Sequence, residues 1–569
     1  MKTTDYIVQA VKTEGITHIF MVPGGLIDPF LSAFDRVPGV APIVAAHESG
    51  AAYMADGYAR GSGKFGVCFC IGGPGITNAV TALATALTDE FPLLLMSGQV
   101  PTDWDGRGGF QDSSAASYDD VDILRTVTAD ELCVDDIRLL KFDLHRLMTR
   151  MLSTPHKPVH LVLPKNIQNA DVDFVYGKLP ASLATPRLLD IQAAMQFAPV
   201  LGQTRKVVIL AGAGIEKSEA SGDLLAFAER FRIPVATTLR AKGVFPEDHP
   251  LALGIFGYSG TRHAIETILS DEVETLIVLG SGLNQRDTLF WSEKFRPSKA
   301  LIHVDNDTLS IGRTYHTELP VVGDCGEFLR FVGADDSAAA ALAAGAADRE
   351  AWMARIRASG PRLYDAENMT SDANPIHPAR VIADLRKVMP RNTVMLVDSG
   401  AHRAFAGHYW ESYAPREYIS ATNLGPMGWA IPAAIGAKLA QPDKPHVVVT
   451  GDGCMLMHGI EIQTAARFGV KVIFVLINNS ALGNVYLRAK TMGPTPTRLT
   501  ENPTHDWAGF ARSLGLHGIT VTEPGSLVTA FEQARDHDGP VLLDIRCGRD
   551  FKTPVAPFAQ SAKEWTDHD

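Results

Sequence analysis

Two side chains able to bind a divalent cation lie in the last third of the chain, each directly after an apolar stretch. Asp452 sits in Gly451-Asp452-Gly453, and Asn479 is the second residue of an Asn-Asn pair further along. Carboxylate and amide oxygens suit Mg²⁺, which commonly completes its octahedral shell with phosphate oxygens. The pair therefore predicts a Mg²⁺ site beside a diphosphate, although each piece taken alone is also typical of an ordinary turn.

The surrounding segments predict the elements that would bring these two residues together. Residues 445–450 form an apolar, β-branched run that ends at a glycine, as expected of a buried parallel strand. Residues 454–468 have helical spacing, and residues 471–477 read as the next strand. Ligands of doubly wound sheets bind at the carboxyl ends of strands, and helix N-termini bind phosphate, so both features would meet at one sheet edge.

The composition is that of a globular protein with small-molecule partners. The chain has 569 residues, 46% of them hydrophobic, which is enough for about three or four domains. A net charge of −12, with both signs mixed along the chain, argues against binding to nucleic acid or to an anionic membrane. Six scattered cysteines, no signal-peptide pattern and no apolar run of ~20 residues predict a cytoplasmic protein with reduced thiols and no membrane span.

Strand and helix patterns alternate along the chain in three blocks. In the first two blocks the predicted strands are 18–22, 65–70, 92–96, 159–163, 206–210, 234–238, 275–279 and 301–304. The fold class is therefore α/β, with three doubly wound parallel-sheet domains at 1–170, 185–335 and 365–550. Similar closing strands at 157–162 and 539–544 indicate that the first and third blocks share an architecture.

The Gly-Asp-Gly segment and its Asn-Asn pair resemble the diphosphate-binding motif of thiamine diphosphate enzymes, most closely that of the acetolactate synthase group. In that family the Asp, the second Asn and a main-chain oxygen two residues later bind the metal. The resemblance thus implies that Asp452, Asn479 and Ala481 hold Mg²⁺. The cofactor contacts that it implies in the same segment are Gly451, Gly453, Cys454 and Asn479.

A second motif, His47 to Arg60, resembles the Glu motif of the same enzymes. In the family this Glu helps the aminopyrimidine of the cofactor to take a proton from the thiazolium ring, a proton-transfer role suited to a carboxyl group. The corresponding residue here is Glu48. On its own, Glu48 could equally be a first-turn residue of a helix.

Further matches follow in chain order and lie largely where strands end, the edge at which doubly wound sheets bind ligands. The resemblance implies that Met427 wedges beneath the cofactor, whereas a lone Met is otherwise more typical of a core. The residues implied to act with Glu48 at the reaction centre are Gly25, Phe110 and Gln111. The remaining implied cofactor contacts are Gly24, Pro74, Asn78, Gly400, His402, Gly425 and Met427.

Near the substrate the chain departs from the family pattern. Ala401 stands where acetolactate synthases usually carry a Gln, and Arg488 stands where they carry a Trp that selects the larger acceptor. Arg488 suggests an anionic or polar acceptor, although a solvated surface Arg is an equal interpretation. Arg286 lines up with an Arg that holds the acceptor carboxylate in the family, which favours an oxo-acid acceptor.

The sequence leaves a bound flavin open. Gly212 and Gly214 follow a predicted strand and could approach a dinucleotide, but a lone Gly-x-Gly is a weak signal. Gly282 replaces an Arg expected in the flavin-binding stretch, and Ile255 and Phe256 replace a Met-His pair. FAD, ADP and an empty site therefore remain alternatives.

The resemblance spans roughly residues 5–548 and implies a thiamine diphosphate- and Mg²⁺-dependent lyase or carboligase. Such an enzyme decarboxylates a 2-oxo acid and transfers the resulting acyl anion to an acceptor. The alternatives are a simple 2-oxo acid decarboxylase, an acyl-transferring lyase, an FAD-dependent oxidoreductase of the pyruvate-oxidase type, and a binding protein without turnover. In the family the Glu and the metal motif come from different subunits, which implies a homodimer or homotetramer with active sites at the interface.

Overall fold

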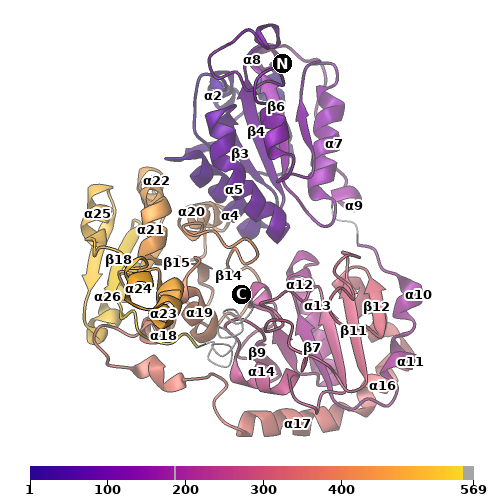
Figure 1. Ribbon diagram of the computed structural model, residues 1–569. Coiled ribbons are helices and arrows are strands. Elements are labelled where there is room, and N and C mark those ends of the chain that lie inside the picture. Colours follow the sequence, from indigo (N-terminus) through magenta and orange to yellow (C-terminus); the bar gives the residue numbers. More distant parts are fainter. Residues whose placement is uncertain (185–186, 555–569) are drawn as a thin grey trace.

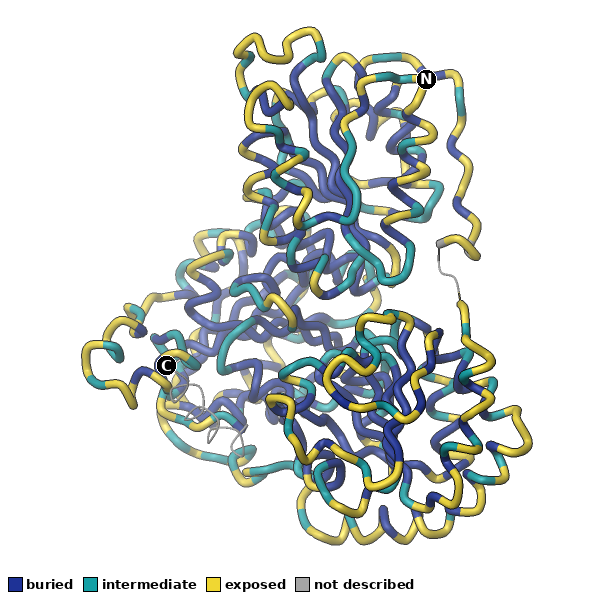
Figure 2. Tube along the Cα trace, turned by 45° about the vertical axis from the view of Figure 1, so that its right-hand side comes forward, coloured by how far each residue is buried: buried dark blue, intermediate teal, exposed yellow. Residues whose placement is uncertain are grey.

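The computed structural model describes residues 1–184 and 187–554, which form three α/β units arranged around a common junction (Figure 1). Each unit contains one six-stranded sheet, and neighbouring strands pair in parallel throughout these sheets. Buried residues follow the strands and the inner faces of the helices, whereas exposed residues lie on the outer helices and loops (Figure 2). The predicted α/β fold class with three parallel sheets is confirmed; the exact domain boundaries stay a prediction.

The first and third sheets have the same strand order. The order is β2-β1-β3-β4-β6-β5 in the first and β14-β13-β15-β16-β18-β17 in the third, so the closing strands occupy equivalent places. The strands of the first sheet are β1 (His18–Met21), β2 (Ala41–Val44), β3 (Gly66–Ile71), β4 (Leu93–Gln99), β5 (Glu131–Cys133) and β6 (Val159–Pro164). Those of the third are β13 (Val394–Val397), β14 (Tyr418–Ile419), β15 (His446–Gly451), β16 (Ile473–Asn478), β17 (His517–Val521) and β18 (Val541–Arg546).

The central sheet has a different order, β12-β11-β10-β7-β8-β9, which is the dinucleotide-fold arrangement with its switch point between β7 and β10. Its strands are β7 (Val207–Ala211), β8 (Val235–Thr237), β9 (Ala252–Ile255), β10 (Thr275–Leu279), β11 (Ala300–Asp305) and β12 (Leu319–Val322). The sequence patterns did not predict β2, β5, β9, β12, β13, β14 and β17, and all of these except β13 lie at sheet edges. Such short runs carry too little periodicity to be recognised alone.

Helices cover both faces of each sheet (Figure 1). The longer ones in the first two units are α1 (Thr3–Thr13), α4 (Glu48–Ser62), α5 (Pro74–Asp89), α7 (Leu140–Leu152), α13 (Ser221–Phe231), α14 (Arg262–Ile268) and α15 (Cys325–Ala334). Two helices, α16 (Asp336–Ala344) and α17 (Ala346–Ala358), lead out of the central unit. The third unit contains α18 (Pro378–Val388), α19 (Ala401–Tyr409), α20 (Ala430–Ala440), α21 (Asp452–His458), α22 (Ile462–Arg467), α23 (Gly483–Met492), α24 (Pro494–Arg498), α25 (Trp507–Ser513) and α26 (Leu527–Asp536).

The first and third units are joined by close packing of α4 against α20. A Cβ atom at Gly57 would lie 2.0 Å from the carbonyl oxygen of Ala433, and one at Gly436 would lie 1.8 Å from that of Met54. Only glycine allows the two backbones to approach so closely. Residues of both units consequently share one hydrophobic core.

The helix predicted at 454–468 is interrupted in the structure. It begins at Asp452, ends at His458, and resumes as α22 after a 3-10 turn, Gly459–Glu461. The carboxylate of buried Glu461 accepts hydrogen bonds from the backbone N–H groups of Ala46 and His47 at 3.2 and 3.0 Å. The turn therefore aims a carboxylate at the first unit, a long-range contact that local spacing does not encode.

Candidate functional site

The two predicted metal ligands lie at neighbouring strand ends. Asp452 follows β15 and Asn479 follows β16, and these strands pair so that Gly451 lies opposite Ile477. The Asp452 side chain is 2% exposed, its Oδ2 accepts a hydrogen bond from Asn502 at 2.9 Å, and burial raises its pKa. The other carboxylate oxygen, Oδ1, therefore has no side-chain hydrogen-bond partner within the described residues. The amide of Asn479 lies at the end of the neighbouring strand, at the same edge of the sheet.

A cavity of about 290 Å³ opens at this sheet edge, beside the switch point between β13 and β15. The predicted site residues that line it are Arg286, Gly400, His402, Gly425, Met427, Gly451, Asp452, Gly453, Cys454, Asn479, Ala481 and Arg488. The cavity therefore brings the predicted metal, diphosphate and substrate residues of the central and third units together. Their roles remain predictions.

His402 and Gly400 form one wall of the cavity. A Cβ atom at Gly400 would lie 2.4 Å from the His402 ring, so only glycine leaves room for the imidazole. Burial lowers the pKa of His402 to about 3, which keeps the ring neutral, and its Nε2 has no hydrogen-bond partner in the described structure. A buried nitrogen of this kind calls for a ligand or water.

Met427 lies on a loop that is fixed by hydrogen bonds. The Ser399 hydroxyl donates to the carbonyl oxygen of Gly425 at 2.7 Å, and buried Asp398 accepts the N–H of Gly428 at 2.9 Å. Burial raises the pKa of Asp398 to about 6. Because a Cβ atom at Gly453 would approach the Met427 methyl group to 2.9 Å, this glycine makes space for the methionine.

Glu48 begins α4, and its carboxylate accepts a hydrogen bond from Asn78 of α5 at 2.9 Å. The two predicted residues therefore meet, and Pro74 occupies the first turn of the same α5 helix. None of them lines the cavity around Asp452. Within a single chain, Glu48, the predicted activator of the cofactor, thus lies outside the cavity that holds the predicted metal ligands.

The other predicted residues of the first unit also lie away from the cavity. Gly24 and Gly25 follow β1, and Lys165 donates a hydrogen bond to the carbonyl oxygen of Gly25 at 2.7 Å. Phe110 is 85% exposed, and Gln111 has a positive φ of 60°. An exposed aromatic side chain next to a residue with a strained backbone indicates that this loop is suited to contacts outside its own chain.

A second, smaller cavity of about 180 Å³ lies at the switch point of the central sheet. It is lined by polar and charged residues, among them Glu90, Asp305 and Arg240, together with Gly214 and Gly282. Burial raises the pKa of Asp305, at the end of β11, to about 6. This is the place that the sequence offered for a nucleotide.

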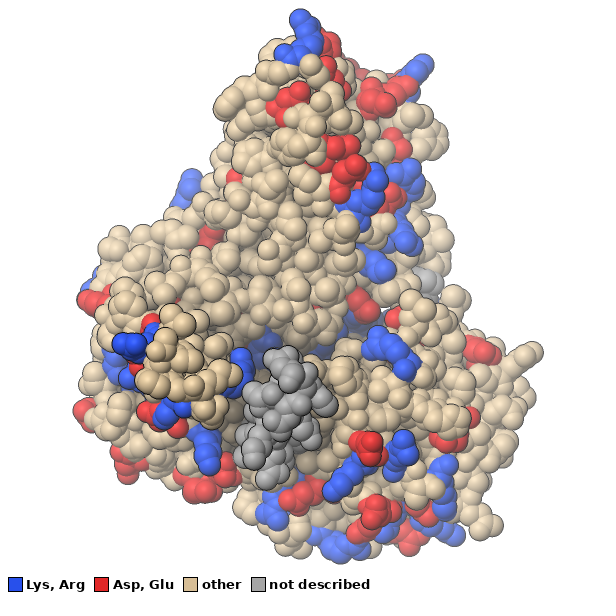
Figure 3. Space-filling view, viewed as in Figure 1, with Lys and Arg blue, Asp and Glu red and all other residues tan. Residues whose placement is uncertain are grey.

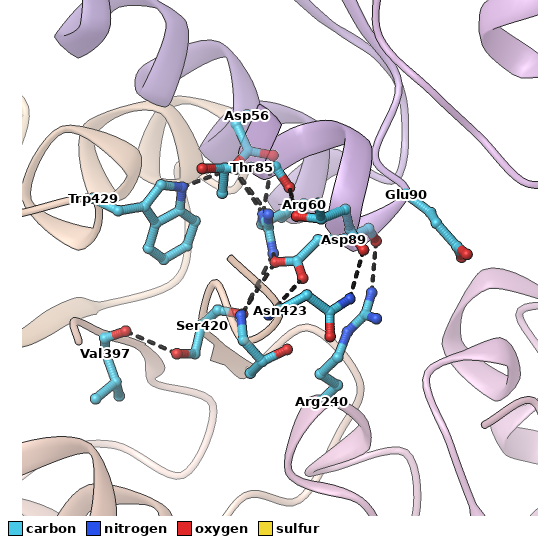
Figure 4. Close-up of polar contacts among 12 residues, drawn as sticks. Asp56, Arg60, Thr85, Asp89, Glu90, Arg240, Val397, Ser420, Asn423 and Trp429 are labelled. Atoms are coloured by element: carbon cyan, nitrogen blue, oxygen red, sulfur yellow. Dashed lines mark hydrogen bonds and ion pairs between the residues drawn. The ribbon is translucent and has the colours of Figure 1, made fainter. Parts of the chain in front are cut away.

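A buried network of charges joins the three units (Figure 4). Arg60 of α4 contacts Asp56 and Asp89, each at 3.0 Å, and all three side chains are at most 3% exposed. Asp89 accepts the backbone N–H groups of Thr422 and Asn423 at 3.2 and 3.1 Å. Although burial opposes it, the positive charges of Arg60 and Arg240 lower the pKa of Asp89.

The network also reaches Arg240 in the central unit and Trp429, which lies at the far end of the loop that contains Thr422 and Asn423. Arg240 donates to the carbonyl oxygen of Asp89 at 2.6 Å, and the indole N–H of Trp429 donates to Asp56 at 2.7 Å. Residues 420–429, which carry Gly425 and Met427, are thus held at both ends by the first unit (Figure 4). The sequence motifs missed this network, because its members meet only after folding.

Other features bear on the class of protein. Lysines, arginines and acidic residues are interspersed on the face shown in Figure 3. In residues 1–184 and 187–554 we find no helix with the length and apolarity that a membrane crossing requires, and no group of three or more His, Cys, Asp and Glu side chains that could hold a metal. A metal at Asp452 would therefore depend on amide, main-chain and ligand oxygens as well.

Comparisons with known proteins agree with the three-unit architecture. Residues 1–119 match the N-terminal TPP binding domain of thiamine pyrophosphate enzymes, residues 195–332 match their central domain, and residues 398–545 match their C-terminal TPP binding domain.

Full-length relatives point to one group of these enzymes. A probable acetolactate synthase large subunit of Methanocaldococcus jannaschii is 33% identical, covering 98% of this chain and 94% of that protein. The acetolactate synthase large subunit of Corynebacterium glutamicum is 32% identical over 96% of this chain and 86% of its own, and the acetolactate synthase of Arthrospira platensis is 30% identical over 96% and 94%. This chain belongs to the thiamine diphosphate-dependent enzymes of the acetolactate synthase family.

Proposed function

We propose that this enzyme decarboxylates a 2-oxo acid and joins the acyl unit to an acceptor 2-oxo acid, using thiamine diphosphate and Mg²⁺. One observation carries the proposal: a single cavity is lined by Asp452, Asn479, Met427 and Arg286. These side chains supply a metal ligand pair, an apolar support and a cation for a carboxylate within one space.

The residues present fit Mg²⁺. The Asp452 carboxylate, the Asn479 side-chain oxygen and the main-chain oxygen of Ala481 would provide the hard oxygen ligands that this ion requires, leaving further positions to diphosphate and water. Asn502 donates to one oxygen of Asp452 at 2.9 Å and would fix the orientation of that carboxylate. The raised pKa of Asp452, caused by burial, is what an incoming cation would reverse.

The residues also fit thiamine diphosphate, which when bound supplies the electron sink for decarboxylation. The unpartnered Nε2 of His402 could donate a hydrogen bond to a phosphate oxygen, and Gly400 and Gly451 keep the wall open on either side of that ring. Met427, which lines the same cavity, would give the cofactor an apolar contact. Arg286 would hold the substrate carboxylate through its guanidinium.

We further propose that Glu48 completes this site from a second subunit, in a homodimer or homotetramer. Glu48, Phe110 and Gln111 lie outside the cavity of their own chain. Large apolar side chains are exposed on both halves, including Phe110 at 85%, Leu456 at 52% and Met457 at 55%. Surfaces of this kind are typical of protein interfaces.

Subunit complementation tests this arrangement. Glu48→Gln and Asp452→Ala proteins, each of low activity alone when the cofactor concentration is limiting, are mixed, dissociated and reassembled. A shared site predicts recovery of about one quarter of the wild-type activity, because random pairing gives half heterodimers with one intact site each. No recovery from demonstrably mixed dimers would place both residues in sites formed by one chain.

The reaction itself is tested with purified enzyme, thiamine diphosphate and Mg²⁺. The enzyme is given pyruvate as donor with a panel of 2-oxo acids and aldehydes as acceptors, and products are identified by mass spectrometry. Carbon–carbon-linked products are expected. Release of aldehyde alone would instead support a simple decarboxylase, and an acyl group on another nucleophile would support an acyl-transferring lyase.

The central cavity supports a second candidate, an FAD-dependent oxidoreductase of the pyruvate-oxidase type. Gly214 and Gly282 allow a close approach of a nucleotide, and Asp305 lies at a strand end suited to bind hydroxyl groups. Carboligation is favoured because a polar cavity of about 180 Å³ offers little apolar surface for a flavin ring. A yellow protein bleached by pyruvate would reverse this preference, and a colourless one would remove the candidate.

Six free cysteines support a reducing, cytoplasmic location.

A further inference from the structure

The substrate end of the large cavity contains an excess of positive charge. Arg286, which follows β10 in the central unit, and Arg488, on α23 of the third unit, line the same cavity. Arg549 also lines it. Among the described lining residues the single carboxylate is Asp452, which the proposed function commits to the metal.

Two of these guanidinium groups form no ion pair within the described residues, although the charge of Asp287 also acts on Arg286. Arg549 is paired with Glu501 at 3.0 Å, whereas neither Arg286 nor Arg488 forms an ion pair with a carboxylate in residues 1–184 and 187–554. The Arg286 guanidinium instead lies 4.7 Å from the centre of the Tyr258 ring. Both side chains are exposed, so water solvates them in part, and neither is held by a carboxylate in an ion pair within the part of the chain that the structure describes. They are therefore free to bind an anionic ligand in the cavity.

The arginines also influence each other. The pKa of Arg286 is lowered, first because surrounding protein displaces water from it and further because of the positive charges of Arg403 and Arg488. Holding like charges together is unfavourable. An anion bound between Arg286 and Arg488 would relieve that repulsion.

A 2-oxo acid with one carboxylate neutralises one of the two cations, which under the proposed function is Arg286. We propose that the acceptor carries a second anionic group, and that Arg488 binds it. The acceptor is thus an acidic 2-oxo acid, in which a carboxylate, sulfonate or phosphonate terminates the side chain. This inference rests on the proposed function and deepens it by naming the acceptor class.

The expected preference for an acidic acceptor corresponds to a small difference in free energy, but it is large enough to measure. A charge-assisted contact with a partly solvated guanidinium corresponds to roughly tenfold in kcat/KM for the acceptor, because one such contact contributes about 1.5 kcal/mol. Salt screens this attraction, so the preference for an acidic acceptor will shrink as ionic strength rises.

The test compares matched acceptors with pyruvate as donor and the cofactors present. The acceptors are 2-oxoglutarate and its 5-methyl ester, which share a carbon skeleton and differ in the terminal charge, together with 2-oxobutyrate. The wild-type enzyme is expected to prefer 2-oxoglutarate about tenfold over its ester. Arg488→Gln is expected to abolish that preference while still using 2-oxobutyrate.

Lys490 provides a matched control on the same helix. It is paired with Asp550 at 2.5 Å and does not line the cavity, so Lys490→Gln should keep the preference of the wild-type enzyme. The unreactive dianion glutarate provides a second readout. Calorimetry measures its binding to the enzyme complex with thiamine diphosphate and Mg²⁺, and this binding should weaken in Arg488→Gln but not in Lys490→Gln. This readout does not depend on turnover.

The outcomes separate this inference from the proposed function. If pyruvate and 2-oxobutyrate are joined but 2-oxoglutarate has no advantage over its ester, or if Arg488→Gln retains the advantage, the acidic acceptor is excluded and carboligation stands. If no acceptor is joined to pyruvate although pyruvate is consumed, carboligation itself fails. Sulfonate- or phosphonate-terminated oxo acids outperforming 2-oxoglutarate would keep the inference and identify the anion.

A different observation carries a second inference. The loop 420–429 holds Met427 against the cavity, yet the groups that fix its ends belong to the first unit: Asp89 accepts from Thr422 and Asn423, and Asp56 accepts from Trp429 (Figure 4). Arg60 bridges the two carboxylates. We infer that Asp56, Arg60 and Asp89 are positioning residues for this loop.

Asp89→Asn tests this role with little change in shape, because the amide loses the ion pair with Arg60 and one of two acceptor oxygens. A positioning role predicts a fall in kcat of about tenfold per folded enzyme, with substrate KM and cofactor affinity changed much less. Asn423→Ala, at an exposed position, removes one contact to the carbonyl oxygen of Thr88 and should give a smaller effect of the same kind.

Asp5→Asn serves as the control, since it breaks an ion pair with Arg36 on the surface of the same unit. It should leave kcat unchanged. Faster proteolytic cleavage within 420–429 in Asp89→Asn would report the loosened loop independently of activity. Wild-type kcat per folded enzyme in both Asp89→Asn and Asn423→Ala would show that the network serves stability alone.

Discussion

The large cavity and the junction between the three units are both rich in charge, yet they treat it differently. At the junction Arg60 lies 3.0 Å from both Asp56 and Asp89, and nothing in this trio is more than 3% exposed. In the cavity, Asp452 has Asn502 as its side-chain hydrogen-bond partner, and Arg286 and Arg488 have no carboxylate partner in the described residues.

Physical chemistry explains why the two patterns coexist in one chain. A buried charge is tolerated when hydrogen bonds and an opposite charge replace water, as at the junction. Charges left without such partners destabilise the folded chain unless a ligand supplies them. In the cavity this cost falls on buried Asp452, whereas Arg286 and Arg488 are exposed and remain partly solvated. The junction instead uses its charges to hold parts of the protein in place.

The largest effect expected in the catalytic region comes from Glu48→Gln. The variant keeps the size of the side chain and its contact with Asn78, but removes the carboxyl group assigned to proton transfer. Turnover should fall about 10²–10⁴-fold, the range typical of a lost acid–base group, while cofactor affinity changes little. Steady-state kinetics and cofactor titration measure both quantities; activity near wild type would remove Glu48 from the reaction.

Asp452→Ala should act on binding instead. Removing the charged ligand is expected to weaken Mg²⁺-dependent binding of thiamine diphosphate by more than about tenfold. The control Asn502→Ala, which leaves the carboxylate and removes only its hydrogen-bond donor, should weaken binding less. Equal cofactor affinity in Asp452→Ala and wild type, measured by fluorescence titration at several Mg²⁺ concentrations, would contradict the metal role.

The two regions also differ in how far the sequence alone predicts them. Asp452 and Asn479 follow long central strands, so apolar runs and a compact motif were enough to place both at one sheet edge. The same reasoning recovered the parallel sheets, but it missed edge strands such as β12, whose four residues alternate in burial and carry little signal.

The junction was beyond the reach of sequence patterns for a physical reason. Asp56, Arg60 and Asp89 lie on helices of the first unit, where charged residues normally face solvent, and nothing local indicates that Trp429 and residues 422–423 cover them. The break in the predicted helix at Gly459 has the same origin, since Glu461 turns toward His47. Such contacts follow from the packing of whole units.

Arg60→Met tests whether the buried charges at the junction stabilise the folded protein. The methionine fills much of the space of the arginine but leaves the carboxylates of Asp56 and Asp89 buried without their cation. The free energy of unfolding should fall by about 3–5 kcal/mol, as for other broken buried ion pairs. Denaturant unfolding measures this loss, with Arg36→Met, at an exposed ion pair, expected to cost at most about 1 kcal/mol. A similar small loss in both variants would mean that the junction charges are not mutually stabilising.

Arg488→Trp should have the smallest effect, and it tests the cavity half of the comparison most directly. Arg488 has no ion-pair partner in the described residues, so its replacement removes no internal salt bridge and stability should change by no more than about 0.5 kcal/mol. Acceptor choice should nevertheless move toward apolar 2-oxo acids by roughly tenfold, because an indole replaces a cation at the substrate end. Competition between 2-oxobutyrate and 2-oxoglutarate for pyruvate measures the shift. A stable variant with an unaltered product ratio would show that Arg488 is a solvated surface residue. In that case, the lack of an ion-pair partner in this cavity would not be evidence that a side chain contacts the ligand.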